Sequence, residues 1–279
     1  MYEIVGRKSM GEGINLYNIL APDIASKALP GQFIILRVYG KGERIPITIA
    51  KTDKNDGTVT ILVQTLGKTT HMLSELNVGD SLADVVGPLG VPTEIIKFGT
   101  VVCIGGGFGI AAIYPIAKAL KESGNKVISI IGARSKNLLL MEDEMRAVST
   151  ELLVATNDGS YGTKGIVTDV LKELIDDKKE PIDRVIAIGP VIMMKAVSDL
   201  TRDKSIKTIV SLNPIMIDGT GMCGACRVLV DKKTKFACVD GPDFDGHKVD
   251  FDNLMNRLKF YKEEEKASYE CHTKEHHQS

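Results

Sequence analysis

The feature that most constrains the fold is a change of hydrophobic period near residue 100. Thr100–Ile104 is a continuous apolar run that leads into three glycines, a helical pattern follows to about Ser123, and a second apolar run occupies Lys126–Ile131. A buried strand, a tight turn, a helix and another buried strand make up a βαβ unit, whose strands are parallel. We therefore expect a parallel sheet with helices on its faces from about this point.

The alternation continues along the next part of the chain. Strands are expected over Glu151–Thr156, Arg184–Gly189 and Lys207–Leu212, and helices over Ile166–Ile175 and Ile192–Thr201. Strands and helices that alternate in this way are typical of a doubly wound, Rossmann-like α/β nucleotide domain. We assign this domain to residues 99–212.

The first part of the chain shows a different pattern. Short runs rich in β-branched residues, at 33–39, 58–65 and 81–86, are separated by turn signals such as Asn55-Asp56-Gly57. Short strands at this spacing predict a small antiparallel β-barrel over residues 1–98. The predicted fold class is thus α+β and α/β, with the barrel followed by the parallel sheet.

The composition changes again after Asn213-Pro214. Residues 213–250 are rich in glycine and cysteine, and we expect them to form a small separate lobe. Apolar residues at 251, 254, 255, 258 and 261 then recur at helical spacing, so residues 251–279 are expected to be a C-terminal helix and a charged tail. This helix could bind a partner or cover its own domain, and the sequence does not decide between the two.

Charge and hydropathy exclude several classes of protein. The chain has 279 residues, 43% of them hydrophobic, and a net charge of -1, which argues against DNA or RNA as the partner. Its N-terminus lacks the basic segment and apolar run of a signal peptide, and its longest apolar runs fall short of the roughly 20 residues that span a bilayer. We therefore expect a cytoplasmic protein that does not enter a membrane.

The glycine turn is the first candidate binding site. Gly105-Gly106-Gly107 runs into Gly107-Phe108-Gly109-Ile110-Ala111-Ala112, a GxGxxA sequence in which a backbone without Cβ atoms can approach a pyrophosphate at the start of a helix. The alternative is a glycine-rich connection that binds nothing. The next strand ends at Arg134 with no acidic residue to meet a ribose, and an Arg there could instead meet a 2′-phosphate, so the choice between NAD and NADP stays open.

Two segments of the barrel could hold a flavin. The stretch Arg44-Ile45-Pro46-Ile47-Thr48 offers a permanent cation for a diphosphate, and its backbone and hydroxyl groups suit the polar edge of a flavin ring. The stretch Gly67-Lys68-Thr69-Thr70 opens a probable helix and offers amides, hydroxyls and a Lys for the same phosphates. The alternatives are a solvent-facing Arg beside a strand and a simple capped helix.

The strongest local signal is a cysteine loop that follows the sheet domain. Asp218, Cys223, Cys226 and Cys238 form the pattern D-x4-C-x2-C-x11-C. The plant-type 2Fe-2S arrangement has the spacing C-x4-C-x2-C with a distant fourth cysteine, so Asp218 takes the place of its first ligand. The alternatives are a structural zinc ion on the same four residues, three unligated thiols, and an Asp218 that only caps the glycine loop.

Several other residues give weaker signals. Asp158 could face a nicotinamide, but Asn157-Asp158-Gly159 is equally a turn. Cys103 is expected to be a buried apolar side chain, and His71 to be structural or exposed. In the tail, Cys271 and His272 with His276 and His277 could bind a metal ion, although a solvated terminus is the expected state.

Taken in order, these segments resemble the ferredoxin-reductase-like electron-transfer subunits typified by that of dihydroorotate dehydrogenase. The resemblance runs from Arg44-Ile45-Pro46-Ile47-Thr48 through the glycine turn, Asn157–Gly162 and Gly189-Pro190 to the cysteine loop. Within that group the stretch Ser211–Gly224 is most similar to the small subunits of NADH-dependent reduced ferredoxin:NADP oxidoreductases, which are electron-bifurcating enzymes.

The resemblance implies the cofactors and the partner. FAD would bind the barrel, NAD(H) the sheet domain at the glycine turn and Gly189-Pro190, and a 2Fe-2S cluster the C-terminal lobe. The partner would be a larger, NADP-binding subunit with flavin and iron-sulfur centres, joined in a heterodimer through which ferredoxin exchanges electrons. Dihydroorotate dehydrogenase subunits have a cysteine where this chain has Asp218, which favours the bifurcating relatives.

Two rival functions remain at this stage. The chain could serve a complex that oxidises dihydroorotate or acts as a sulfide dehydrogenase, without bifurcation. A rival of another class is a non-redox module that holds structural zinc.

Overall fold

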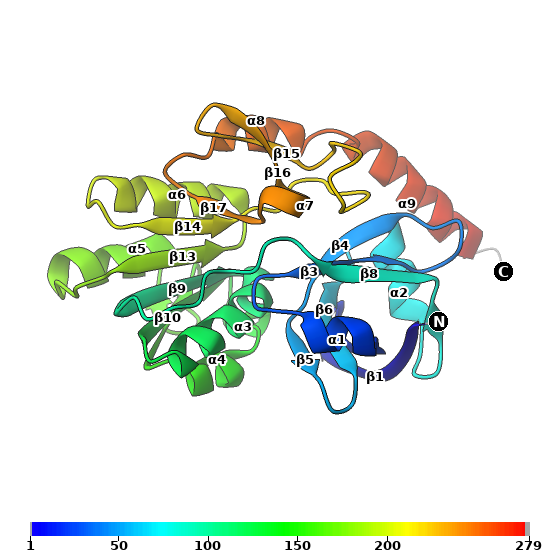
Figure 1. Ribbon diagram of the computed structural model, residues 1–279, viewed down its shortest axis with the longest axis horizontal. Helices are drawn as coiled ribbons and strands as arrows, with labels where there is room; N and C mark the ends of the chain where they lie inside the picture. Colours follow the sequence, from blue (N-terminus) through cyan, green and yellow to red (C-terminus); the bar gives the residue numbers. More distant parts are fainter. Residues whose placement is uncertain (1, 277–279) are drawn as a thin grey trace.

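The computed structural model describes residues 2–276 of the chain, with side chains through residue 274. Two β-rich bodies lie side by side, the N-terminal one on the right in Figure 1 and the α/β one on the left, and the C-terminal part of the chain lies across the top of both. Within the described residues, no helix is long and apolar enough to cross a membrane.

The N-terminal body is built from two antiparallel sheets around one core. The core gathers the inward side chains of these strands, such as Tyr17, Ile34 and Ile61. Five strands form the first sheet in the order β5-β6-β2-β1-β7, and three form the second in the order β4-β3-β8. The elements are β1 (Tyr2–Gly11), β2 (Ile14–Leu20), α1 (Pro22–Lys27), β3 (Phe33–Arg37), β4 (Arg44–Thr48), β5 (Lys51–Asp53), β6 (Thr58–Gln64), α2 (Lys68–Glu75), β7 (Ser81–Leu82) and β8 (Asp84–Leu89).

The α/β body is a seven-stranded sheet in the order β12-β11-β10-β9-β13-β14-β17. All neighbouring strands are parallel except β17, which pairs antiparallel with β14 at one edge. The strands are β9 (Thr100–Gly106), β10 (Lys126–Ala133), β11 (Glu151–Thr156), β12 (Thr163–Lys164), β13 (Arg184–Ile188), β14 (Thr208–Ser211) and β17 (Asp243–Asp245).

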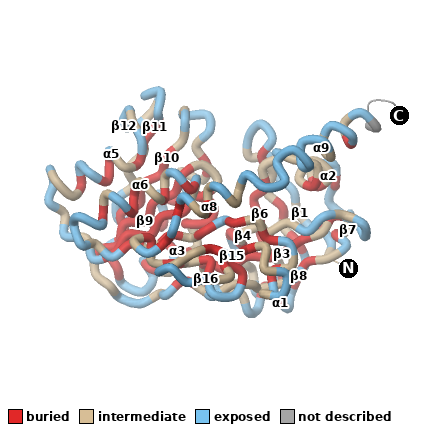
Figure 2. The backbone as a smooth tube through the Cα atoms, turned by 90° about the horizontal axis from the view of Figure 1, so that it is seen from above, coloured by how far each residue is buried: buried red, intermediate tan, exposed pale blue. Residues whose placement is uncertain are grey.

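Helices cover both faces of this sheet. Apolar residues of α3 (Gly109–Glu122) and α4 (Glu142–Val148) pack on one face, and those of α5 (Val167–Lys172) and α6 (Val191–Arg202) pack on the other. The strands between them are almost wholly buried (Figure 2). The predicted helix at residues 166–175 is instead α5 followed by a wider π-helical turn, Glu173–Asp177, and a 3-10 turn at Lys136–Leu138 was not predicted.

The sheet has a topological switch point between β9 and β13. From β9 the chain moves to β10 on one side and later returns to β13 on the other. Connections leave these two strands in opposite directions, so a crevice opens at their carboxyl ends, which is where open α/β sheets bind ligands. The fold class predicted from the sequence is confirmed, and the predicted glycine turn lies at this crevice.

The C-terminal part consists of a hairpin and three helices. β15 (Arg227–Val230) pairs with β16 (Lys233–Phe236), and the short α7 (Ala237–Asp240) follows. α8 (Phe251–Arg257) begins at Asp250, whose carboxylate accepts the Asn253 N–H, and it packs on α6 and β15. The left-handed backbone of Tyr261 (φ 66°) ends this segment, so the predicted single helix is two, and α9 (Lys262–His276) runs on to the N-terminal body.

Candidate functional site

A cavity of about 710 Å³ lies where the N-terminal body meets the switch point of the sheet. Its walls come from β4 and β6 on one side and from the glycine turn, the end of β10 and the start of α6 on the other. Nine residues predicted as binding residues line it: Pro46, Ile47, Thr48, Gly106, Gly107, Gly109, Arg134, Gly189 and Pro190. The fold therefore brings the flavin and nucleotide candidates to one place.

The glycine turn has the steric role that its sequence predicts. Gly107 adopts the left-handed region (φ 53°), and its N–H donates to the carbonyl of Gly132 at 2.9 Å. A Cβ on Gly109 would overlap the carbonyl oxygen of Ile188 and lie 2.8 Å from the Cα of Gly189. Only glycine lets α3 start this close to the end of β13. In the first turn, the N–H groups of Ile110 and Ala111 donate to the carbonyls of Gly107 and Phe108, each at 3.2 Å.

Arg134 and Asp158 lie at the ends of neighbouring strands. Arg134 lines the cavity, and its carbonyl accepts the N–H of Asp158 at 3.2 Å. The Asp158 carboxylate accepts the Ser160 N–H at 2.9 Å and is exposed, and hydrogen bonds from Ser160 keep the pKa of Asp158 below its usual value. Asp158 is thus placed as a turn residue beside the cavity and does not line it.

The Gly67–Thr70 segment is a capped helix start outside the cavity wall. The Thr70 hydroxyl accepts the N–H groups of Leu66 and Gly67 at 2.9 and 3.0 Å and donates to the Gly67 carbonyl. Thr69 is buried and donates to Glu43 at 3.0 Å. Both hydroxyls are therefore engaged within the protein, so of this segment only the amides and Lys68 remain for a phosphate.

A smaller cavity of about 150 Å³ extends the large one toward the cysteine lobe. The two share seven lining residues, and Met216 and Pro242 of the lobe also line the smaller one. The shared residues are Pro46, Ile47, Thr48, Ala112, Ile188, Ser211 and Asn213. The two cavities therefore adjoin each other between the nucleotide crevice and the lobe, and side chains of the barrel and of residues 211–216 line both.

The cysteine loop holds two buried thiols in contact. Cys226 and Cys238 are each 2% exposed, and their Sγ atoms lie 3.1 Å apart, whereas Cys223 is exposed at the loop surface. Burial, followed by the nearby Cys226 sulfur, raises the pKa of the Cys238 thiol to about 12. Two thiolates bound to one tetrahedral metal ion at ~2.3 Å lie about 3.7 Å from each other. The sulfurs of Cys226 and Cys238 would therefore have to move slightly apart to bind the same iron.

Asp218 faces the same loop from its start. Its Oδ2 accepts the hydroxyl of Thr220 at 2.6 Å and the N–H groups of Thr220 and Met222 at 3.1 and 3.2 Å. These hydrogen bonds, chiefly those of Thr220, and the Arg44 cation farther off hold the pKa of Asp218 below its usual value. The carboxylate is thus ionised at neutral pH, as a metal ligand must be, and it also caps the glycine loop.

The donor set fits an iron-sulfur cluster. Asp218, Cys223 and Cys226 lie on one loop, whose Gly219 and Gly221 adopt left-handed backbone (φ 80° and 86°), and α7 brings the Cys238 sulfur to that of Cys226. A Cβ on Gly219 would meet Ile35 and Leu89, so the loop packs directly on the barrel. The lobe is therefore not remote from the flavin candidates, and Arg44 lies close enough to Asp218 to lower its pKa.

Some lining residues carry no sequence signal of their own. Most are apolar or small and lie next to a motif or opposite it: Ile14, Leu62, Gln64, Leu66, Phe108, Leu138, Leu140, Ile188, Ser211 and Asn213. Leu66 and Phe108 could have been inferred as neighbours of glycine motifs. The others are brought in by strand register. Cys103 is fully buried, which raises its pKa to about 12, so it is the inert core thiol that was predicted.

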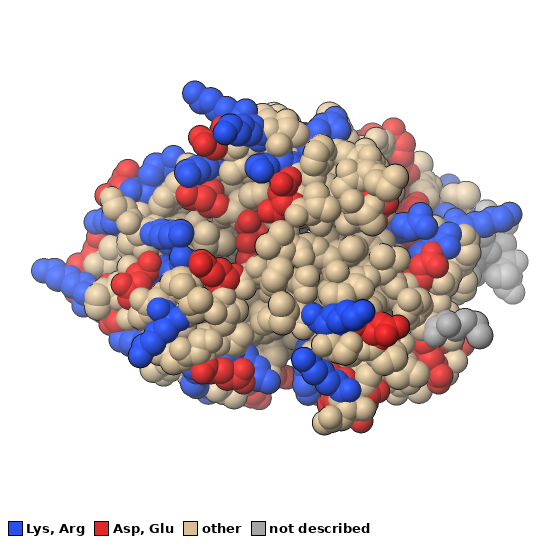
Figure 3. Space-filling view, viewed as in Figure 1, with Lys and Arg blue, Asp and Glu red and all other residues tan. Residues whose placement is uncertain are grey.

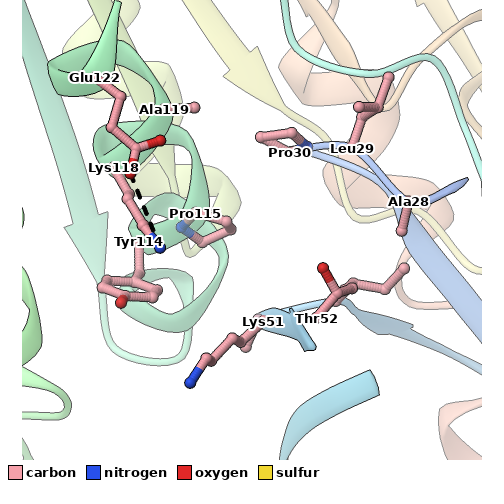
Figure 4. Close-up of a pocket in the computed structure, with 12 residues that line it drawn as sticks. Ala28, Leu29, Pro30, Lys51, Thr52, Tyr114, Pro115, Lys118, Ala119 and Glu122 are labelled. Carbon is pink, nitrogen blue, oxygen red and sulfur yellow. Dashed lines mark ion pairs between the residues drawn. The ribbon is translucent and has the colours of Figure 1, made fainter. Parts of the chain in front are cut away.

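A third cavity, of about 190 Å³, lies between β5 and the C-terminal half of α3 (Figure 4). Lys118 and Glu122 of α3 form an ion pair at 3.9 Å on its wall, with Lys51 opposite. The carboxyl end of a helix carries partial negative charge, so this cavity is a poorer place for a dinucleotide than the amino end of the same helix.

Comparison with known proteins agrees with this geometry. Residues 103–199 match the family model of the oxidoreductase NAD-binding domain, and residues 213–250 match that of the iron-sulfur cluster binding domain of dihydroorotate dehydrogenase B. A Thermotoga maritima protein described as a dihydroorotate dehydrogenase B (NAD(+)) electron transfer subunit homolog is 51% identical, with 96% of this chain and 94% of the relative covered. The chain belongs to the dihydroorotate dehydrogenase B electron-transfer subunit family.

Two further similarities set this family member in context. The Fusobacterium nucleatum electron transfer subunit is 35% identical, over 76% of this chain and 83% of its own length. A solved structure of the NADH-dependent reduced ferredoxin-NADP oxidoreductase, described for flavin-based electron bifurcation, superposes with a TM-score of 0.92 at 49% identity and covers 98% of both chains. The predicted family, the oxidoreductase class, and the NAD and iron-sulfur binding domains are thus confirmed.

Proposed function

We propose that the chain is an electron-transfer flavoprotein subunit that moves electrons between NAD(H), FAD and a 2Fe-2S cluster. The observation that carries this proposal is the lined route from the glycine turn past the barrel wall to Met216 and Pro242 of the lobe, whose cysteine loop packs on the barrel at Gly219. We also propose that the chain divides by function at about residues 98, 212 and 250, into FAD, NAD(H) and cluster parts followed by the C-terminal helices.

Each part of the route has a role in this proposal. β4 would hold FAD, with Arg44 on its diphosphate and Pro46, Ile47 and Thr48 along its ring, and Gly67, Lys68, Thr69 and Thr70 would add helix amides and a cation for the phosphates. The nucleotide would lie on Gly105, Gly106, Gly107, Gly109, Arg134, Asp158, Gly189 and Pro190. Asp218, Cys223, Cys226 and Cys238 would hold the cluster.

In this proposal the side chains of the chain bind and orient the cofactors, and they transfer no protons. The FAD that the barrel would hold would supply the link between the two-electron chemistry of a nicotinamide and the one-electron chemistry of an iron-sulfur cluster. Ile188 and Pro190 give the crevice apolar walls, and the contact of the cysteine loop with the barrel keeps the path for electrons short. No side chain in the cavity needs to act as a general acid or base.

We expect NADH to reduce the bound flavin faster than NADPH. Arg134 lines the cavity, but the closely similar solved structure is of an NADH-dependent enzyme. Stopped-flow bleaching of the flavin absorbance with each nucleotide measures the preference. A faster reaction with NADPH would contradict the NAD assignment and would make Arg134 a ligand of the 2′-phosphate.

The partner is a further part of the proposal. We infer a larger, NADP-binding subunit with flavin and iron-sulfur centres, which would exchange electrons with ferredoxin in an electron-bifurcating heterodimer. Support comes from the 49% identical chain in the structure of the NADH-dependent reduced ferredoxin-NADP oxidoreductase, which is described for flavin-based electron bifurcation. Three of the five cysteines, Cys223, Cys226 and Cys238, gather at the proposed cluster, which is typical of a reducing compartment, so we place the complex in the cytoplasm. The rival partner is a dihydroorotate- or sulfide-oxidising subunit, and the chain that co-purifies distinguishes them.

An apolar rim around the cysteine loop suggests where this partner docks. Ile217, Met222 and Val239 are 47%, 87% and 45% exposed, and each directly adjoins a proposed cluster ligand. Lys and Arg side chains are sparse over the centre of the face seen in Figure 3 and gather around its edges. An exposed apolar rim is what a partner would need to exclude water beside the cluster.

We expect Met222→Glu to weaken co-purification of the larger subunit at least tenfold. A charge at a position that becomes buried in the interface costs several kcal/mol unless it is paired. Pull-down of the complex from cells that express both subunits measures it, with Val78→Glu as the control, because Val78 is 58% exposed in the N-terminal body and lines none of the three cavities. Equal recovery of the two variants would remove Met222 from the interface.

A further inference from the structure

α9 ends against α2 in a cluster of side chains that serves none of the functions above. α9 packs on α2 at the far side of the N-terminal body from the crevice, and most of its length is exposed (Figures 1 and 2). His272 is the exception, at 7% exposed, so the expected solvated tail is wrong at this position. Tyr269 and His272 lie three residues apart on one face of α9, and their rings meet that of His71.

The cluster brings three metal-ligating atoms together. One ligand atom each from His71, Glu75 and His272 lies within 4.8 Å of the other two. His71 and Glu75 are four residues apart on α2, so they project from the same face of that helix. The Nδ1 of His71 lies 3.4 Å from Oε1 of Glu75, and this nitrogen and the Nε2 of His272 are buried.

We propose that His71, Glu75 and His272 form a binding site for a divalent transition-metal ion, with zinc as the best-fitting ion. Two imidazoles and one carboxylate are a ligand set that zinc uses with three protein ligands and an open fourth position. A tetrahedral shell at ~2.0–2.1 Å places neighbouring ligand atoms about 3.3–3.4 Å apart, close to the His71–Glu75 separation. The ligand atom of His272 lies within 4.8 Å of the other two and would move closer when the ion binds.

The exposure and the ring geometry of the His71, Glu75 and His272 cluster suit a bound metal ion. The His71 and Glu75 side chains are 32% and 37% exposed, which leaves a path for the ion and a solvent position for its fourth ligand. The two histidine rings meet edge to face, with centroids 5.5 Å apart and planes at 79°, so their nitrogens can converge on one point without stacking. Cys271 is exposed and is not one of the three converging residues.

The ion would fasten α9 to the N-terminal body. Two of its ligands lie on α2 and one on α9, and these two helices are separated by more than 180 residues of the sequence. The two helices bring the three ligands together only in the folded chain. An ion bound to them therefore stabilises the folded state, as structural zinc ions do. The proposal is independent of the electron route, and its failure would leave the proposed function unchanged.

The test is isothermal titration of Zn²⁺ into the full-length, cluster-loaded protein after chelator treatment, with flavin and cluster absorbance recorded before and after. We expect one ion to bind per chain. The dissociation constant should be at least tenfold larger in His71→Gln and in His272→Ala, and Glu75→Gln should lose less affinity. Cys271→Ser is the matched control and should bind as the parent does. The midpoint of thermal unfolding should rise with Zn²⁺ in the parent and in Cys271→Ser only.

The opposite results would overturn the site. They are no binding by the parent at 100-fold excess of Zn²⁺ over protein, or equal binding by the parent, His71→Gln and Glu75→Gln. The last two substitutions are at partly exposed positions, so they report even where His272→Ala fails to fold. Weakening by Cys271→Ser instead would assign the ion to the thiol and would also contradict the proposed ligand set.

Discussion

Replacing Asp218 by cysteine is expected to keep the cluster but to shift its midpoint potential by on the order of 100 mV, with a changed electron paramagnetic resonance spectrum of the reduced state. A carboxylate is a harder donor than a thiolate, and replacement of two cysteines by two histidines, as in Rieske centres, moves the potential of a 2Fe-2S centre by hundreds of millivolts. The spacing of Asp218 to Cys223 is that of the first two ligands of the plant-type pattern. Spectroelectrochemical titration of the two proteins measures the shift.

The control separates the ligand role from the capping role. Asp218 Oδ2 already accepts hydrogen bonds from Thr220 and Met222, so a substitution to alanine would remove both roles at once. Asp218→Asn keeps an acceptor oxygen for those bonds and loses the charge. As a ligand variant it should lose the cluster or alter its spectrum. If Asp218→Asn matches the parent while Asp218→Ala does not, Asp218 is only a cap.

We expect Gly109→Ala to lower the midpoint of thermal unfolding by about 5–10 °C and to slow flavin reduction by NADH at least tenfold. The added Cβ would overlap the Ile188 carbonyl, and backbone does not yield as a flexible side chain would. Overpacking of this kind costs about 1–3 kcal/mol or more, and a chain of this size loses ~2–4 °C for each kcal/mol. The forced separation of α3 from β13 would also widen the nucleotide crevice.

Gly40→Ala is the matched control for this substitution. Gly40 has open space around its Cβ position and no left-handed backbone, so its change removes only the conformational freedom of glycine. Differential scanning calorimetry and stopped-flow reduction should therefore show the parent's values for Gly40→Ala. A Gly109→Ala protein within about a degree of Gly40→Ala, reduced by NADH at the same rate, would mean that the close packing of α3 on β13 does not shape the site.

The sequence was a good guide wherever one local rule decides the structure. Continuous apolar runs located β9, β10 and β13 because both faces of these strands are buried, and β11 matches its predicted bounds at Glu151–Thr156. The glycine turn was located because its conformation admits no side chain at Gly109. The remaining strands and lining residues depend on how the strands pair. β1, β2 and β12 carry no distinctive sequence pattern, so neither their pairing nor the cavity residues opposite the motifs could be inferred.

Contacts between distant segments were the part that local patterns could not predict. Arg44 was expected to act apart from the cysteine loop, yet the loop packs on β3 and β8, and Arg44 lowers the pKa of Asp218. His71 was considered alone and His272 only with its neighbours in the tail, because nothing in their local sequence links α2 to α9. The break at Tyr261, which sends α9 back to the N-terminal body, depends on one left-handed residue that no sequence rule favours for tyrosine.

The most direct test of the central claim is an anaerobic titration of the purified full-length chain with NADH, with flavin, iron, sulfide and zinc quantified in the same sample. The account predicts one FAD, about two iron and two sulfide per chain, no zinc on the cysteine loop, and successive bleaching of the flavin and cluster absorbance by NADH. A colourless protein with zinc on the three cysteines and no response to NADH would contradict it and would establish the non-redox zinc module instead.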